Sequence, residues 1–321
     1  MTSQRCKKKV KQLINELGQK ANTVISRMHF VPEYVEQYIQ ITANDKESKK
    51  ALVKIQSLKI RTSSSEEDIS RLIELAKDFS DKVARHAAQE LMTFVGKQKR
   101  PDVDDWISVL ESSNFSGVRR YCLDALNQLV KQGMNDKHLN RIWVNLSKQR
   151  KSKLEETQKM GDLVANWIEF NNCITPKVTE IIDGIVQYLQ TNANGYIAGT
   201  LFKVFKMITR TQERTILCPK LIEWSRTLLI TINIKTINNG QSEVAQVLRL
   251  IDDIEPSFLC IIVEKDCPNM SPYNREENVC AVVAAIHKCG GTKVNLLDYV
   301  RRSEWCPPKT IALISKIQLK G

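Results

Sequence analysis

Hydrophobic and polar positions alternate along most of the chain with the period of an α-helix. In residues 3–28 the apolar side chains recur at intervals of three and four: Val10, Leu13, Ile14, Leu17, Ala21, Val24, Ile25 and Met28. This spacing places them on one face of a helix and predicts that the face is buried. Pro32 suits the first turn of a second helix, to about residue 43, and a third helix is expected over residues 48–59.

The clearest break in the first third of the chain is the segment Thr62-Ser63-Ser64-Ser65-Glu66-Glu67-Asp68. It has the composition of a loop that ends in a helix N-cap, followed by acidic residues in the first turn, where they favour the helix dipole. Ser64 and Ser65 stand three residues before Glu67 and Asp68. That spacing suits either a capping box or phosphorylation sites directed by the acidic residues.

Two segments that lie 35 residues apart match each other without a gap. When residues 83–95 are laid on residues 118–130, the matched pairs include Val83 with Val118, Arg85 with Arg120, Leu91 with Leu126 and Val95 with Val130. The preceding helices are predicted to match as well, with Leu72 and Leu75 falling on Ile107 and Leu110. A period in the thirties to forties with two helices per unit indicates a helical-repeat architecture.

The string Asp81-x-Val83-x-Arg85-x-Ala87-Ala88-x-x-Leu91 resembles the second helix of a HEAT repeat, and the likeness to armadillo/HEAT proteins covers residues 68–130. In that family small residues let neighbouring helices pack closely, and Val and Leu fill the core between repeats. The resemblance implies an all-α fold in which roughly six to seven helical hairpins form a right-handed α-α superhelix. The alternative is two ordinary amphipathic hairpins that match by chance.

Later segments continue the helical spacing of apolar residues. The expected pairs are 139–146 with 153–170, 176–189 with 196–208, and 219–232 with 242–251, followed by 276–289, 296–300 and 308–318. Residues 229–234 alternate like a strand and 258–263 are a short apolar run, and we predict that both are buried helix because no partner strands are evident. The predicted organisation is a basic N-terminal cap at 1–61, HEAT-like repeats at 68–256, and C-terminal repeats or a cap at 257–321.

The composition indicates a soluble intracellular protein. No run of about 18 apolar residues predicts a membrane span, and the first residues lack the apolar stretch of a secretory signal. A mitochondrial transit peptide is the alternative, since the first acidic residue is Glu16, but the early lysines resemble a nuclear address more closely. Nine scattered cysteines argue for a reducing compartment.

The positive charge is concentrated at the N-terminus. Of the net charge of +12, residues 1–61 hold +8, from 13 Lys and Arg against 5 Asp and Glu. The candidate binding residues for nucleic acid or an acidic partner form two clusters: Arg5, Lys7, Lys8, Lys9, Lys11, Lys49 and Lys50, and then Lys148, Arg150, Lys151 and Lys153. Such clusters can contact phosphates, serve as nuclear-import signals or meet an acidic protein, and the alternative is a solvated helix face.

Arginines recur at equivalent repeat positions, namely Arg85 on one helix and Arg119 and Arg120 on the next. If second helices line a concave face, as the resemblance implies, these side chains are candidates for a basic row that faces a ligand. The alternative is structural, with each arginine paired to an acid of a neighbouring repeat, such as Asp81 or Asp124.

Catalytic motifs are not apparent. The sequence lacks a phosphate-binding GxxxxGK[ST] loop and a GxSxG nucleophile elbow, and Cys280, His287, Cys289 and Cys306 are spaced wrongly for a zinc knuckle. We therefore predict a non-enzymatic protein–protein interaction scaffold or adaptor with no cofactor or metal. Its predicted location is the nucleus in preference to the cytoplasm. The alternatives are a nucleic-acid-binding protein that uses the basic N-terminal helices and, by architecture alone, a HEAT-like DNA glycosylase with Asp105 beside Trp106.

Overall fold

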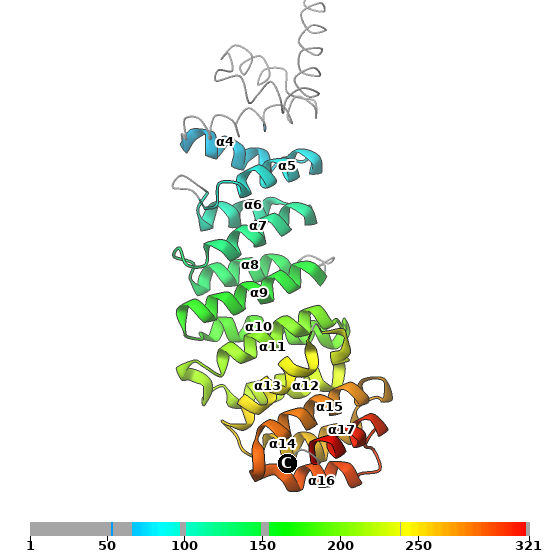
Figure 1. The fold of residues 1–321 in the computed structure, drawn as a ribbon. Coiled ribbons are helices and arrows are strands. Elements are labelled where there is room, and N and C mark those ends of the chain that lie inside the picture. The colour runs from blue at the N-terminus through cyan, green and yellow to red at the C-terminus, as the bar shows by residue number, and fades with distance from the viewer. Residues whose placement is uncertain (1–52, 54–65, 97–100, 149–153, 238, 319–321) are drawn as a thin grey trace, which may run out of the picture. The chain divides into compact units, whose positions relative to one another are not determined.

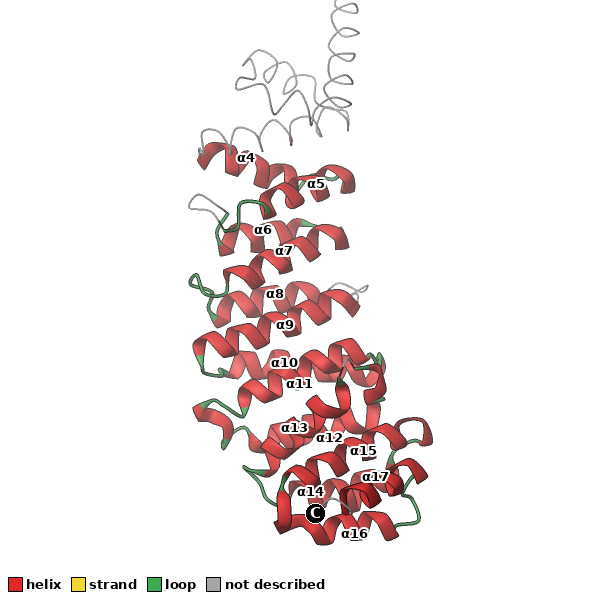
Figure 2. Ribbon diagram, viewed as in Figure 1, coloured by secondary structure: helices red, strands yellow, loops and turns green. Residues whose placement is uncertain are grey.

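The computed structural model describes Val53 and residues 66–96, 101–148, 154–237 and 239–318. All regular elements in these residues are helical, and none of them is a strand (Figure 2). The predicted all-α class is therefore confirmed for this part of the chain. The helices expected within residues 3–59 lie outside the described residues. The chain divides between Leu129 and Val130 into two compact units, which are described separately.

The described residues of the first unit, from Glu66 onwards, contain two helical pairs. Its helices are α4 (Glu66–Ala76), α5 (Asp81–Met92), α6 (Val103–Ser112) and α7 (Ser116–Leu129) (Figure 1). Helix α4 packs on α5 and α6 packs on α7, while α4 also contacts α6 and α5 contacts α7. The first helices of the pairs thus form one layer, and the second helices form another.

The second helices of this unit confirm the 35-residue match. The positions that are buried on α5 and just after it coincide with buried positions on α7 and just after it: Val83 with Val118, Ala84 with Arg119, Ala87 with Cys122, Ala88 with Leu123, Leu91 with Leu126, Phe94 with Leu129, and Val95 with Val130. Val83 and Val118 are both fully buried. Both helices therefore turn the same sequence positions inward.

The first helices match in a different register from the predicted one. Leu75, predicted to be equivalent to Leu110, is only half-buried. The buried positions of α4 and α6 coincide at an offset of 34 residues instead: Ile69 with Val103, Leu72 with Trp106, Ile73 with Ile107, and Ala76 with Leu110. One residue turns a side chain by about 100° around a helix of 3.6 residues per turn. The equivalence of α4 and α6 therefore follows from which positions are buried and not from which residues are identical.

The second unit continues with further pairs of helices. They are α8 (Asp136–Lys148), α9 (Leu154–Asn171), α10 (Pro176–Thr191), α11 (Gly195–Ile208), α12 (Cys218–Thr231), α13 (Gly240–Asp252), α14 (Phe258–Ile261), α15 (Pro272–Lys288), α16 (Val294–Arg302) and α17 (Pro308–Gln318). Helix α14 runs directly into a π-helical segment, Ile262–Asp266. Each helix that the sequence predicted after residue 139 is present, with ends that differ by a few residues.

The helices of the second unit are also arranged in two layers. Along one layer α9 contacts α11, α11 contacts α13, α13 contacts α15, and α15 contacts α17. Along the other, α8 contacts α10 and α10 contacts α12, and the π-helical segment after α14 packs on α12. We call these the second-helix layer and the first-helix layer. No helix in the described residues is long and apolar enough to cross a membrane.

The strand-like segment 229–234 is helical only in part. Helix α12 ends at Thr231, Ile232 is extended, and Ile234–Thr236 form a short 3₁₀ turn. The prediction of helix through residue 234 is therefore wrong at its end. The reason lies on α15, where the buried Asn278 amide donates to the carbonyl oxygens of Leu229 and Ile232 at 2.6 and 2.7 Å, and its oxygen accepts from the N–H of Ile234 at 3.0 Å.

The other ambiguous segment, residues 258–263, is buried helix as predicted. Helix α15 packs on both α12 and α13, so segments on either side of residue 257 are in contact. The division into a basic cap, HEAT-like repeats and C-terminal repeats or a cap stays a prediction. Residues on both sides of this position belong to one compact unit.

Candidate functional site

Most residues of the two predicted basic clusters lie outside the described part of the chain: Arg5, Lys7, Lys8, Lys9, Lys11, Lys49, Lys50, Arg150, Lys151 and Lys153. Ser64 and Ser65 lie outside it as well. Lys148 is described, and it is exposed at the last residue of α8. A cation there complements the negative end of the helix dipole, so its position has a structural explanation.

The three recurring arginines have different surroundings. Arg85 is exposed, and its Nη2 donates to Asp81 Oδ2 at 2.7 Å. Asp81 is thus its partner, as the structural alternative suggested, but it belongs to the same helix and not to a neighbouring repeat. Arg119 is only 3% exposed and donates to the carbonyl oxygen of Ser113 at 3.1 Å, whereas Arg120 is half-buried. A buried Arg119 does not belong to a row that faces a ligand.

Asp105 and Trp106, which suggested the glycosylase alternative, have structural roles at the start of α6. The Asp105 carboxylate accepts from the N–H of Asp102 at 3.0 Å, and the Asp102 carboxylate accepts from the N–H of Asp105 at 2.8 Å. This is a reciprocal capping box. Burial raises the pKa of Asp105 above its usual value, and Trp106 is fully buried. The pair therefore offers no open aromatic-and-acid site.

A cluster of positive charge lies on and just after α11. Asn194 caps this helix, since its Oδ1 accepts from the N–H groups of Tyr196 and Ile197. Lys203, Lys206 and Arg210 follow at intervals of three and four residues, which places them on one side of the helix. Residues 195–211 contain no Asp or Glu. We call these three cations the α11 basic stripe.

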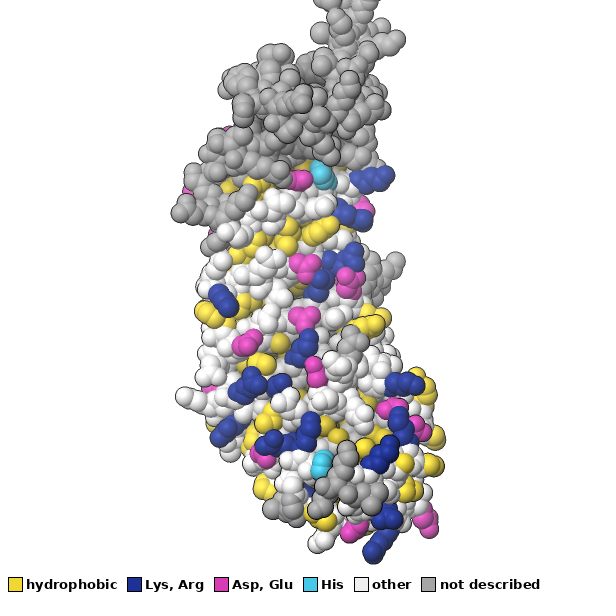
Figure 3. Space-filling view, viewed as in Figure 1, with side chains coloured by type: hydrophobic (Ala, Val, Ile, Leu, Met, Phe, Trp, Pro, Cys, Tyr) yellow, Lys and Arg dark blue, Asp and Glu magenta, His cyan; other side chains and the backbone are white. Residues whose placement is uncertain are grey.

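The side chains of the α11 basic stripe are available to a ligand. Lys203 and Arg210 are exposed, and the half-buried Lys206 donates to Gln246 Oε1 on α13 at 2.9 Å. Within the described residues none of the three forms an ion pair. Lys and Arg side chains gather over α11 and α13 in the space-filling view (Figure 3). Their charge is balanced by solvent ions, which an anionic partner can displace.

The helices on either side of α11 carry acidic side chains. On α9, Asp162 is half-buried and Glu169 is exposed. On α13, Glu243 is half-buried and Arg249 pairs with the exposed Asp253 at 3.2 Å. The positive surface is therefore about one helix wide.

The connection from α12 to α13 crosses the first half of α11. A Cβ at Gly195 would overlap Thr236, and one at Gly199 would come within 3.1 Å of Ile237 Cγ2. The absence of side chains at these glycines lets the connection lie against the helix. Because Gly195 and Gly199 are four residues apart, their side of α11 continues towards Lys203 and Lys206. The connection leaves the second half of that side open.

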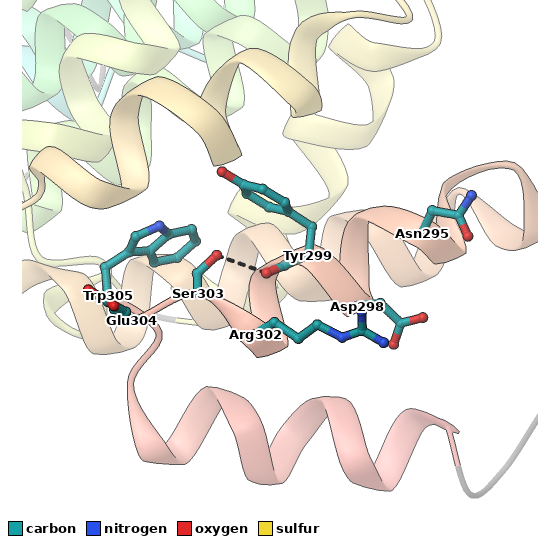
Figure 4. A pocket seen from close by; sticks show the side chains of 7 residues that line it. All are labelled: Asn295, Asp298, Tyr299, Arg302, Ser303, Glu304 and Trp305. Atoms are coloured by element: carbon teal, nitrogen blue, oxygen red, sulfur yellow. Dashed lines mark hydrogen bonds between the residues drawn. The ribbon is translucent and has the colours of Figure 1, made fainter.

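A second surface feature is an open pocket of about 700 Å³ formed by α16 and the loop that follows it (Figure 4). Its lining residues are Asn295, Asp298, Tyr299, Arg302, Ser303, Glu304 and Trp305. Ser303 Oγ donates to the carbonyl oxygen of Tyr299 at 2.8 Å, an ordinary contact within one helical turn. Of the two carboxylates in the lining, Asp298 accepts from Gln318 Nε2 at 2.9 Å, and Ser303 Oγ donates to the backbone instead of to a carboxylate. The pocket therefore shows no nucleophile–base hydrogen bond.

The cysteines considered for zinc are not gathered around a common point. Cys280 Sγ lies 3.4 Å from Thr310 Oγ1, and Cys289 Sγ donates to Asp252 Oδ2. The described residues contain no group of three or more His, Cys, Asp and Glu that could hold a metal ion. Burial raises the pKa of Cys289 and of Cys306 to about 11, so both thiols hold their protons at neutral pH.

The α11 basic stripe was not predicted from the sequence, although a signal for it is present there. Three cations at helical spacing in a segment without acidic residues can be found by inspection. The limits of the stripe cannot be found in this way, because they depend on which residues of α9 and α13 lie beside it.

Comparison with known proteins does not extend this description. No protein-family model matches the sequence, and no curated protein matches it. The function must therefore be inferred from the chain's own residues.

Proposed function

We propose that this chain is a non-enzymatic scaffold of the armadillo/HEAT-like kind, whose second-helix layer docks another protein. The observation that carries the proposal is the coincidence of buried positions between α5 and α7, at a constant offset of 35 residues. Successive helical pairs that bury equivalent positions also expose equivalent positions. A stack of such pairs presents an extended surface for a partner.

In this proposal the helical pairs within each unit stack as a right-handed superhelix. The α11 basic stripe is the docking point that the structure favours. Its charge is not neutralised by neighbours, and a charged rim accelerates and orients association. Two features do not favour an enzyme over a scaffold. Trp106, the aromatic residue of the glycosylase alternative, is buried, and the thiols of Cys289 and Cys306 are protonated at neutral pH.

The proposal is tested by recovering the tagged full-length chain from its native cells. We expect one or more proteins to be recovered reproducibly with the wild type and to be lost from the variant Lys203→Glu/Lys206→Glu/Arg210→Glu. The matched control is Lys137→Glu/Lys177→Glu/Lys265→Glu. It makes the same change of charge as the stripe variant, but on the first-helix layer and its π-helical segment, and it should still recover the partner proteins. Recovery of no protein, together with turnover of a nucleic-acid or nucleotide substrate, would contradict a scaffold.

A nuclear location and nucleic-acid binding remain secondary proposals. They are supported by the net charge of +8 in residues 1–61. If those residues bind nucleic acid, reversing Lys7, Lys8, Lys9 and Lys11 to Glu should abolish a salt-sensitive affinity for DNA or RNA. Unchanged affinity would exclude this role for the cluster.

A further inference from the structure

We infer that the α11 basic stripe binds a short acidic segment of a protein partner, rich in Asp and Glu. The inference rests on the proposed function and names the chemistry of the partner. It depends on three features of the second unit: the charge and spacing of the stripe, the width of the positive surface, and the open second half of α11.

The spacing of the cations fits a row of carboxylates. Lys203 and Arg210 are seven residues apart on or just beyond α11, which corresponds to about 10 Å at 1.5 Å per residue. An extended peptide covers that distance in about three residues. The exposed Arg210 guanidinium can take a carboxylate through two parallel N–H bonds, whereas the lysines act as point charges. Because side chains of an extended peptide alternate between its two sides, acidic residues at every second position face the same way, about 7 Å apart, and two or three of them lie along the stripe.

The width of the positive surface favours a peptide over a nucleic-acid duplex. Neighbouring packed helices are about 8–10 Å apart. Helix α9 presents the exposed carboxylate of Glu169, and just after α13 lies the exposed carboxylate of Asp253, which pairs with Arg249. A duplex has grooves about 12 and 6 Å wide, so its phosphates would lie over those carboxylates. An extended peptide is narrow enough to remain over α11.

The connection that crosses α11 defines where the segment lies. Thr236 and Ile237 occupy the side of the helix above Gly195 and Gly199. The open part begins near Lys203 and runs past the helix end to Arg210. We therefore place the acidic segment along the second half of α11, with its acidic residues over the stripe.

The experiment is fluorescence anisotropy with the full-length chain and four labelled probes. The probes are a short peptide of alternating acidic residues and Ser, the same peptide with Gln and Asn in place of the acids, a single-stranded oligonucleotide and a duplex. We expect the acidic peptide to bind with an affinity that falls as salt is added, and the amide peptide not to bind. The variant Lys203→Glu/Lys206→Glu/Arg210→Glu should weaken binding about 10-fold or more, as expected from three lost surface contacts.

The same control variant, Lys137→Glu/Lys177→Glu/Lys265→Glu, should bind the acidic peptide within about twofold of wild type. The milder variant Lys203→Gln/Lys206→Gln/Arg210→Gln repeats the test if charge reversal disturbs folding, which circular dichroism monitors. Equal loss in the stripe and control variants would overturn the inference, as would a duplex that binds more tightly through the same three residues. The proposed function would survive that result if the stripe variant still lost a cellular partner.

Discussion

The contacts that join successive helical pairs can be compared between the two units of this protein. In the first unit α5 and α7 share an apolar seam, with the small side chains Ala87 and Ala88 on α5 matched by Cys122 and Leu123 on α7. In the second unit, polar side chains reach from one pair to the next. Trp224 Nε1 donates to Asp183 Oδ1 at 2.7 Å across 41 residues, and the Arg226 guanidinium donates twice to Asp266 at 2.8 Å across 40 residues.

These polar contacts fix how one pair is positioned against the next. Asp266 is nearly inaccessible, with a side chain 3% exposed, and the hydrogen bond to it raises the pKa of Arg226. The buried Asp252 accepts from Lys293 at 2.7 Å and from the N–H of Leu259 at 3.1 Å. A hydrogen-bonded pair has a narrower range of acceptable geometry than an apolar contact has. These contacts therefore add geometric specificity to the packing of the helical pairs in the second unit.

The contrast between an apolar seam and polar contacts also explains why the repeat is visible in only part of the sequence. An apolar seam reuses similar residues at a constant offset, whereas each polar contact uses its own residue types. In addition, the second helices α9, α11, α13 and α15 begin at residues 154, 195, 240 and 272, which are steps of 41, 45 and 32 residues. Variable connections of this kind hide a structural repeat from sequence comparison.

Asn278→Ala should have the largest effect on stability, because this side chain serves three buried backbone groups. Its loss leaves the carbonyl oxygens of Leu229 and Ile232 and the N–H of Ile234 without their partner. At about 1–3 kcal/mol for each of the three unsatisfied buried groups, we expect a loss of about 3–9 kcal/mol. Urea unfolding measures it, with the exposed Asn295→Ala as the control. A loss as small as that of the control would show that polar contacts do not stabilise the second unit.

Leu91→Ala and Leu126→Ala should each destabilise the first unit by about 2–5 kcal/mol, the usual range for a fully buried leucine. Because they occupy matching positions, the two losses should be similar. The half-buried Leu75→Ala should cost less, since its side chain is not part of the inward face. Thermal or urea unfolding checks this, and a smaller loss for Leu126→Ala than for Leu75→Ala would contradict the apolar seam.

Alkaline pH should have a smaller effect through Cys289 and Cys306 in the second unit, as one part of a wider contribution, since burial also raises the pKa of Cys122 and of Cys267. The thiols of Cys289 and Cys306 have the ordinary cysteine pKa of 9.0 when the chain is unfolded and a pKa of about 11 when it is folded, because burial disfavours the thiolate. Above pH 9 the unfolded chain loses these protons while the folded chain keeps them, so stability falls as pH rises towards 11. After allowance for solvent exposure, we expect these two thiols together to lower the free energy of unfolding by about 1 kcal/mol.

The measurement is the free energy of unfolding as a function of pH, compared between wild type and Cys289→Ala/Cys306→Ala. The variant should be less stable overall but should lose stability less steeply above pH 9. An identical slope in both proteins would show that these thiols do not contribute to the pH dependence.

Much of the fold could be predicted because its signals are local. Helical spacing of apolar residues located α8 to α13, and the match of Val83 with Val118 located the second-helix seam. The end of α12 could not be predicted, because it is determined by Asn278, 46 residues beyond Ile232. In the same way, the cations of the α11 basic stripe can be read from the sequence, but the Lys206–Gln246 contact and the acidic flanks arise only from packing.

The central claim is that second helices of successive pairs lie directly against each other, and the contact between α9 and α11 tests it most directly. A Cβ built on Gly161 would lie 3.5 Å from Thr200 Cβ, within the range that a disulfide requires. Gly161→Cys/Thr200→Cys should therefore form a disulfide under mild oxidation, identified by mass spectrometry of the digested protein, whereas Gly161→Cys/Lys203→Cys should not. Absence of the first cross-link, or equal formation of both, would contradict this packing.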